Sequence, residues 1–334
     1  MNDKYTGSLS PELQSQALLL HHQGHSVRSI AKHMDASYGV VRGFMEWLLD
    51  DSELQAIVPQ DIPSLKEVGL VEPPPGPAIL IYDIETAPAR NFTWSAYQTN
   101  IIDVDTDWYM LSFGYKWLGQ KGGHFVGLLD DPDFFPDTTN DKYVAIRLAS
   151  LFDRADITVA HNGDKFDVKK GNSRFVFNGY GPPSPHQDID TLRESKRYFS
   201  EYKHTLADLG RLYTRERKLK TIGFELWREC MRGNPEMWAE MEKYNRQDVT
   251  TLERLYLKIR PWIGSPGKKA HPNLGLWDLG NLVCPKCGSR DVVRRGWHRT
   301  TVSEYPTIQC KSCKGYSRIR ERKSQRDGRH VGAL

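Results

Sequence analysis

Two acidic residues stand at the end of a strongly apolar run in the stretch ILIYDIETAP, residues 79–88. The run from Ile79 to Tyr82 predicts a buried β-strand, and Asp83 and Glu85 follow it with one isoleucine between them. Side chains alternate along a strand, so these two carboxylates share one face. Two carboxylates held together beside apolar residues repel each other and lose solvation unless a proton or a cation lies between them. The pair therefore predicts a cation site whose other ligands come from elsewhere in the chain.

The segment 156–170, DITVAHNGDKFDVKK, carries further acids past the end of a strand. Its β-branched start is typical of a short strand, Asn162 and the following glycine predict a turn, and a helix then opens with Asp164 and Asp167. Ligands collect just beyond the carboxyl ends of strands in open α/β sheets, which is where these acids fall. Taken alone, either acid is more typical of a helix cap or a salt-bridge partner.

A long amphipathic helix predicted at residues 235–259 supplies the last two candidates, Tyr244 and Asp248. They are four residues apart and therefore lie on one face of the helix, where such a pair is usually a hydrogen-bonded surface pair. The occurrence of all three segments in this order favours one shared site over three unrelated ones.

In combination, these segments resemble the DEDD exonuclease superfamily, and in particular its tyrosine-bearing branch. That family carries D-x-E on its first strand, N-x2–3-(F/Y)-D in its second motif and Y-x3-D in its third. The matching residues here are Asp83-Ile84-Glu85, Asn162-x3-Phe166-Asp167 and Tyr244-x3-Asp248. The central segment is most similar to YprB-like nucleases with a ribonuclease H fold and to the proofreading domains of family B DNA polymerases. Asp164 is the rival for the third acid, and the family spacing after Asn162 favours Asp167.

The resemblance implies a metal-dependent 3′→5′ exonuclease that hydrolyses single-stranded or frayed DNA, with RNA as the other candidate substrate. Two Mg²⁺ or Mn²⁺ ions roughly 3.5–4 Å apart would create the nucleophile and neutralise the leaving oxyanion. Carboxylate oxygens suit both metals. The implied ligands are Asp83, which bridges both ions, Glu85 and Asp248 at the first ion, and Asp167 at the second.

The resemblance gives Tyr244 the role of orienting the attacking water. A free tyrosine has a pKa of about 10, so its hydroxyl is a poor base near neutral pH. Asn162 and Phe166 are the substrate-binding candidates in the second motif, although Asn162 could equally hold the backbone turn. For His161, beside Asn162, a packed and hydrogen-bonded histidine is favoured over a functional one.

Four of the five cysteines form the pattern C-x2-C-x22-C-x2-C, with the members Cys284, Cys287, Cys310 and Cys313. Two thiolates separated by two residues bend around one ion, and two such knuckles complete a tetrahedral zinc site. Because all four positions are thiolates, no position is left for a reactive water. The pattern predicts one structural Zn²⁺ and resembles a zinc ribbon, a small β unit that folds on metal binding.

Basic charge is concentrated around these cysteines. Residues 284–334 hold 13 Lys and Arg against 4 Asp and Glu, whereas residues 1–283 hold 33 basic and 38 acidic residues. Arg294, Arg295 and Trp297 interleave basic and aromatic side chains, as nucleic-acid-binding surfaces do, and are the predicted substrate-binding residues of this module. A solvated basic tail and a protein-binding surface are the alternatives.

The N-terminal segment is predicted to be helical, with a first helix that begins at Ser10-Pro11 and a short interval at Asp35-Ala36 between the second and third helices. This spacing resembles the helix-turn-helix domains of resolvases and transposases. Through residue 50 there are four Lys and Arg and five Asp and Glu, which is little positive charge for a duplex binder. DNA contact, protein docking and a purely structural role therefore all stay open for this module.

The predicted fold class is α/β: a ribonuclease-H-like mixed sheet flanked by helices, with a three-helix N-terminal module and a C-terminal β zinc ribbon. Aromatic residues of the central segment, such as Trp94, Tyr97, Tyr109 and Trp117, are assigned to the core by default. The expected boundaries are a helix-turn-helix module at 1–52, a proline-rich linker at 53–77, the nuclease domain at 78–262, a linker at 263–280, the zinc ribbon at 281–322 and a basic tail at 323–334.

Nucleic acid, most of all single-stranded DNA, is the expected partner, with replication or repair proteins as further candidates. No apolar stretch approaches the ~20 residues that cross a bilayer, so no membrane partner is expected. The chain start lacks the layout of a secretory signal, and paired cysteines favour a reducing compartment: the cytoplasm, the nucleoid or a host cytoplasm. A ribonuclease-H-like recombinase or transposase, and a non-catalytic nucleic-acid-binding protein with a degenerate nuclease fold, are the alternative functions.

Overall fold

The structure of the chain is a computed structural model that describes residues 9–22, 27–48, 59–135, 137–215, 222–264, 271–278, 281–300 and 303–319. The predicted basic tail at 323–334 lies outside the described residues. The chain divides into two compact units, residues 1–60 and residues 61–334. No helix in the described ranges is long and apolar enough to cross a membrane.

The described part of the N-terminal unit contains three helices, α1 (Pro11–His22), α2 (Val27–His33) and α3 (Tyr38–Leu48), as predicted for this module. Its core is formed by Ile30, Val41, Phe44 and Met45 among other buried apolar residues. The backbone turns between α2 and α3 at Asp35, which adopts a left-handed conformation with φ 49°.

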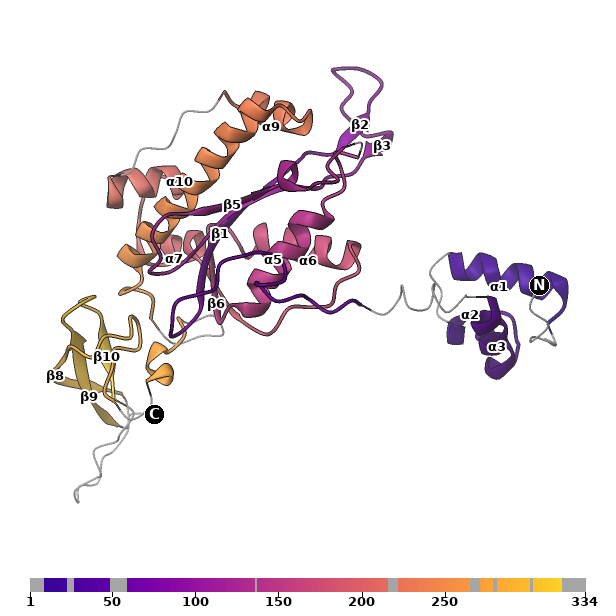
Figure 1. Cartoon of the computed structure of the whole chain (residues 1–334). Coiled ribbons are helices and arrows are strands. Elements are labelled where there is room, and N and C mark those ends of the chain that lie inside the picture. Colours follow the sequence, from indigo (N-terminus) through magenta and orange to yellow (C-terminus); the bar gives the residue numbers. More distant parts are fainter. Residues whose placement is uncertain are drawn as a thin grey trace. The chain divides into compact units, whose positions relative to one another are not determined.

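The second unit is built on a five-stranded mixed sheet (Figure 1). Its strands are β1 (Ile79–Thr86), β4 (Met110–Trp117), β5 (His124–Gly127), β6 (Ile157–Ala160) and β7 (Gln187–Asp190). In space they run in the order β5-β4-β1-β6-β7. β4 pairs antiparallel with β1 and β5, whereas β6 pairs parallel with β1 and β7. The predicted mixed sheet is confirmed.

Helices cover both faces of this sheet. One face of β1, with Leu80 and Tyr82, packs with α5 (Lys142–Arg154) and α6 (Asp167–Phe177) in one buried apolar cluster. The opposite face, with Ile79 and Ile81, packs with the C-terminal half of α10 (Pro235–Ile259). The remaining helical elements of this unit are the 3-10 turn Leu128–Asp130, α7 (Thr191–Tyr198), α8 (Leu206–Leu209), a π-helical turn Gly210–Thr214, α9 (Phe224–Met231) and the 3-10 turn Leu274–Trp277.

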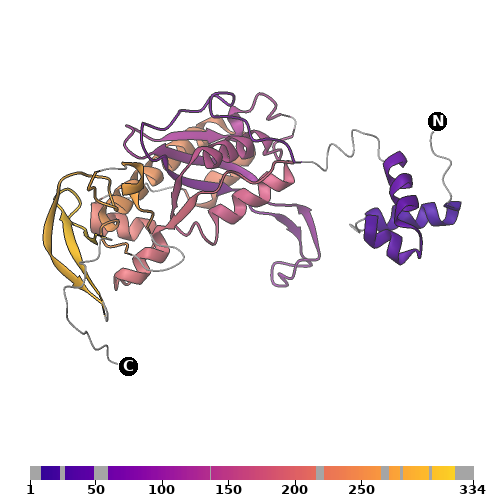
Figure 2. The ribbon, with the colours of Figure 1, turned by 90° about the horizontal axis from the view of Figure 1, so that it is seen from below.

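A two-stranded hairpin, β2 (Arg90–Phe92) and β3 (Asp103–Thr106), separates β1 from β4 and stands away from the sheet in both views (Figures 1 and 2). Trp94 and Tyr97 lie in its loop and are 81% and 97% exposed. Their default assignment to the core was therefore wrong, because a hairpin with no layer packed on it buries neither face. Tyr109 and Trp117 are buried in the core as predicted.

The C-terminal strands β8 (Val292–Arg299), β9 (Glu304–Cys310) and β10 (Tyr316–Arg318) form a three-stranded antiparallel sheet that carries the cysteines. This zinc ribbon contacts the end of α10. The Lys286 ammonium donates to the carbonyl of Pro261, and Tyr256 of α10 lies 2.7 Å from His271 Nε2. The His271 Nδ1 faces the Pro272 carbonyl at 2.7 Å, so Nδ1 carries the proton and Nε2 accepts from the Tyr256 hydroxyl.

The buried His271 predicts a loss of stability in mild acid. Burial, reinforced by the charges of Arg260 and Lys286, lowers the pKa of His271 from 6.5 to about 4. Between these two values the unfolded chain binds a proton that the folded chain does not. The free energy of unfolding should therefore fall as the pH drops from 6.5 towards 4, by up to roughly 3 kcal/mol, and should be fully retained above pH 6.5.

Urea unfolding of the wild type and His271→Gln at pH 7.5 and 5.5 measures this contribution. Zinc loss and carboxylate titration affect both proteins alike, so the wild type should lose more stability than the variant on acidification. Parallel losses in the two proteins would contradict a neutral, buried His271.

Candidate active site

The two acids of β1 are half-buried and continue the face that Ile79 and Ile81 present to α10. In the antiparallel register with β4, Asp83 pairs with Gly114 and Glu85 pairs with Ser112. Since Ser112 is fully buried, any element packed over it lies directly beside both acids.

The element packed there is the middle turn of α10. A Cβ atom on Gly114 would lie 2.8 Å from the carbonyl oxygen of Asn245, so only glycine permits this close approach of helix and strand. The Ser112 hydroxyl donates to Asn245 Oδ1 at 3.2 Å. Tyr244 and Asp248 lie on this stretch of α10, so the contacts of Asn245 bring both beside the β1 acids.

Three of the acids affect the pKa of the Tyr244 hydroxyl. This hydroxyl donates a hydrogen bond to the Asp248 carboxylate. Burial raises the pKa of Tyr244 well above 10, and the negative charges of Asp248, Glu85 and Asp83 raise it further. Tyr244 is therefore a neutral hydrogen-bond donor at physiological pH and not a base.

Asp167, the first residue of α6, reaches the same strand from the side. β6 pairs with β1 only as far as Ile81, and beyond that point Asp167 Oδ1 accepts from the Ile84 amide at 3.1 Å. This amide lies between Asp83 and Glu85 in the chain. Asp167 is 1% exposed, and burial together with the charge of Asp190 raises its pKa to about 7.

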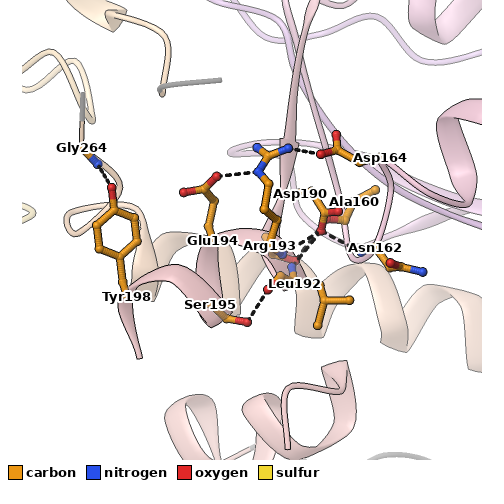
Figure 3. A network of polar contacts seen from close by, with 11 residues as sticks. Ala160, Asn162, Asp164, Asp190, Leu192, Arg193, Glu194, Ser195, Tyr198 and Gly264 are labelled. Atoms are coloured by element: carbon orange, nitrogen blue, oxygen red, sulfur yellow. Dashed lines mark hydrogen bonds and ion pairs between the residues drawn. The ribbon is translucent and has the colours of Figure 1, made fainter. Parts of the chain in front are cut away.

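Asp190 holds the turn that precedes α6 (Figure 3). Its Oδ1 accepts from the Asn162 amide at 2.9 Å and from the amides of Leu192 and Arg193 at 2.9 and 3.2 Å, so it caps α7 as well. Asn162 adopts a left-handed conformation with φ 72°. Asp164, the rival for the third acid, forms an ion pair with Arg193 of α7 (Figure 3).

Trp227 of α9 is a neighbour of the acids that sequence reasoning missed. Its indole Nε1 donates to Glu85 Oε2 at 3.1 Å, and its ring meets the Tyr244 ring edge-on with centroids 5.9 Å apart. A tryptophan in a helix of mixed composition gives no sign of such a role, because its partner lies 142 residues earlier. The contact orients the Glu85 carboxylate.

Changing Trp227 to phenylalanine should weaken the response to divalent metal. The phenyl ring keeps an aromatic contact with Tyr244 but donates no hydrogen bond, so Glu85 is less well oriented. Loss of a residue that orients a ligand typically costs 10–100-fold in metal affinity or activity. A Mg²⁺ titration of strand cleavage should show a half-maximal concentration about tenfold higher than in the wild type. An unchanged midpoint would show that the indole N–H does not support the site.

The four carboxylates fit divalent cations of the Mg²⁺ type. Such ions prefer oxygen ligands, and the negative potential that raises the pKa values of Asp167 and Tyr244 is what a cation would relieve. Within the described ranges, the group of three or more potential ligand atoms that all lie within 4.8 Å of one another is the four cysteines and not these carboxylates.

The four cysteines form a compact cluster in the ribbon. Cys284 Sγ lies 3.7 Å from Cys313 Sγ, and Cys287 Sγ lies 3.6 Å from Cys310 Sγ. A tetrahedron with Zn–S bonds of about 2.3 Å separates its sulfurs by about 3.8 Å. The cluster is therefore compatible with the predicted structural Zn²⁺.

The other predicted substrate-binding residues lie on exposed surfaces. Phe166 is 37% exposed, with the Lys170 ammonium 5.8 Å from its ring centroid. Arg294, Arg295 and Trp297 lie on β8 of the ribbon and not on the elements that carry the acids.

His161 has a packed and hydrogen-bonded environment, which agrees with the prediction. Its Nδ1 lies 2.9 Å from Thr191 Oγ1, and its Nε2 lies 2.9 Å from the carbonyl of His204.

Comparison with known protein families gives one match: residues 122–260 match the model of the RNase H superfamily. The matched region begins after β4, so it contains Asp167, Tyr244 and Asp248 but not Asp83 and Glu85. No curated protein matches the chain. RNase H-like nucleases generally use divalent metals such as Mg²⁺. The central domain thus has an RNase H-like nuclease fold.

Proposed function

We propose that the protein is a metal-dependent 3′→5′ exonuclease that hydrolyses the phosphodiester bonds of single-stranded or frayed DNA. One observation carries the proposal: the residues of three separated sequence motifs lie around one stretch of β1. Asp83 and Glu85 lie on the strand, and Asp167 accepts a hydrogen bond from the Ile84 amide between them. The charges of both strand acids and of Asp248 raise the pKa of Tyr244.

The chain's own residues provide a site for the scissile phosphate and the attacking water. Mg²⁺ or Mn²⁺ held by Asp83, Glu85, Asp167 and Asp248 would supply a water of lowered pKa and neutralise the leaving oxygen. Tyr244 stays protonated and can orient that water by hydrogen bonding. Its own hydroxyl is fixed by Asp248, and Glu85 is fixed by Trp227.

The polarity and the preference for single strands rest on the resemblance of the three motifs to the DEDD exonucleases. Tyr244 with Asp248 is the feature that supports this branch over ribonuclease-H-like recombinases, whose acids follow other patterns. A neutral, buried tyrosine hydrogen-bonded to a carboxylate is consistent with the role that the resemblance gives it.

A cleavage ladder tests the proposal. DNA and RNA strands of one sequence, labelled at either the 5′ or the 3′ end, are incubated with the protein and Mg²⁺, with and without a chelator. A 5′ label should yield successively shorter products, whereas a 3′ label should leave at once as a mononucleotide, and the chelator should stop both. Cleavage only at internal positions, joining of the strand to a second DNA, or the absence of any cleavage would contradict the proposal.

A further inference from the structure

A cavity of about 570 Å³ lies between the zinc ribbon and the residues that follow α10. Ile263 and Gly264 line it from the nuclease domain. From the ribbon, its wall includes Lys286, His298, Tyr316 and Arg318. A volume of this size is typical of sites that hold one small ligand or one segment of a larger one.

The chemistry of this wall suits a nucleic-acid strand. Lys286, His298 and Arg318 offer nitrogen donors, and no acidic side chain is among the described residues that line the cavity. The ring of Tyr316 is 57% exposed and therefore available for stacking. Cationic donors bind phosphate, and an exposed aromatic ring stacks on a base of any identity.

Two further features distinguish this wall. The Arg318 guanidinium lies over the ring of Tyr305, 4.8 Å from its centroid, which fixes the direction of a flexible side chain. The neighbouring Ser317 also lines the cavity, and its buried Oγ has no hydrogen-bond partner in the described part of the chain. These features distinguish the cavity from the solvated arginines of β8.

The cavity has a defined relation to the candidate active site, because α10 connects them. From Asp248 to Ile259 the helix advances about 16 Å at roughly 1.5 Å per residue. The cavity begins a few residues beyond the helix end. A stacked nucleic-acid strand advances about 3.4 Å per nucleotide along its axis, so this distance corresponds to about five nucleotides of a stacked strand.

We propose that this cavity binds one nucleotide of the substrate strand, phosphate and base, about five or more nucleotides upstream of the end that is being cleaved. This inference rests on the proposed function and extends it to the substrate length. A strand of three nucleotides can reach the carboxylates but not the cavity, whereas a strand of twelve can occupy both.

Binding measured without cleavage tests the proposal. Fluorescence anisotropy of zinc-loaded, full-length protein is recorded without Mg²⁺, with labelled oligo-dT of three and twelve nucleotides. The wild type should bind the twelve-mer at least about tenfold more tightly than the three-mer, and Arg318→Ala or Tyr316→Ala should each weaken twelve-mer binding about tenfold. The twelve-mer salt slope should fall by about one for Arg318→Ala.

Lys311→Ala is the matched control, since Lys311 is 57% exposed on the same ribbon and does not line the cavity. Its effect should stay below about twofold. An equal loss in Lys311→Ala, or no loss in Tyr316→Ala, would overturn the proposal. Tyr316→Ala also decides the question if Arg318→Ala fails to retain zinc. Because binding is read without metal-dependent cleavage, an inactive wild type would refute the nuclease proposal separately.

Discussion

Replacing Asp248 with asparagine should lower the rate of Mg²⁺-dependent strand cleavage by about 10³-fold or more. Through the bound cation, the carboxylate would stabilise the charged transition state by several kcal/mol. Each 1.36 kcal/mol corresponds to a factor of ten in rate. Asparagine has the same shape, so α10 should keep its packing against Gly114. Thermal unfolding without metal should show an unchanged or higher midpoint, since one of the mutually repelling charges around Tyr244 is removed.

Asp164→Asn provides the matched control for this loss. It also removes one carboxylate from an RNase H-like domain, but that carboxylate is paired with Arg193 of α7. Its cleavage rate should stay within about threefold of the wild type, because a partly exposed ion pair contributes little to stability. If Asp164→Asn lost activity as severely as Asp248→Asn, or if Asp248→Asn kept wild-type activity, the assignment of the acids would be wrong.

The second large effect is expected for zinc. Cys284→Ser should release the ion and unfold the ribbon, because structural zinc contributes roughly 10–16 kcal/mol to the folding of small metal modules. Within the described part of the ribbon the buried apolar side chains besides cysteine are Val283 and Ile308, too few to stabilise it alone. The five-stranded sheet has its own core and should stay folded.

Three measurements separate these outcomes. The zinc released to a chromogenic chelator should be about one ion per chain for the wild type and none for Cys284→Ser. Limited proteolysis should cut within residues 281–319 and spare the sheet. The affinity for a twelve-nucleotide strand should fall, most strongly at higher salt. Cys230→Ala, which removes a buried thiol from the core of the nuclease domain, should keep its zinc. Unchanged strand affinity in Cys284→Ser would exclude the ribbon from substrate binding and favour a protein partner.

Much of the fold was predictable because its main elements carry their own local signals. The run from Ile79 to Tyr82 is buried in β1, as its apolar composition predicted. The bounds predicted for α10 at 235–259 are those observed, because Asn234 caps the helix through the Glu236 amide and Pro235 occupies its first position.

Other elements depend on contacts that no local pattern encodes. β7, with the sequence QDID, has three polar residues in four and forms a strand only because β6 offers it a parallel edge. The two-stranded hairpin β2–β3 carries exposed apolar residues. Hydrophobicity alone would assign these residues to a core.

The motifs name the acids of the candidate site, which stay a prediction, but they do not name the contacts around those acids. The motif spacing favours Asp167, whereas its bond to the Ile84 amide exists only because β6 ends before β1 does. The contact of Trp227 with Glu85 likewise joins segments whose proximity is a property of the folded chain.

Binding of Mn²⁺, followed by calorimetry with zinc-loaded protein at pH 8, tests the central claim most directly. At this pH Asp167 is ionised, because its pKa is about 7. The wild type should give a saturable isotherm, and Asp83→Asn, with the same fold by circular dichroism, should lose it or bind at least about tenfold more weakly. Identical isotherms for the two proteins, or no binding to the wild type, would contradict a divalent-metal site built from these carboxylates.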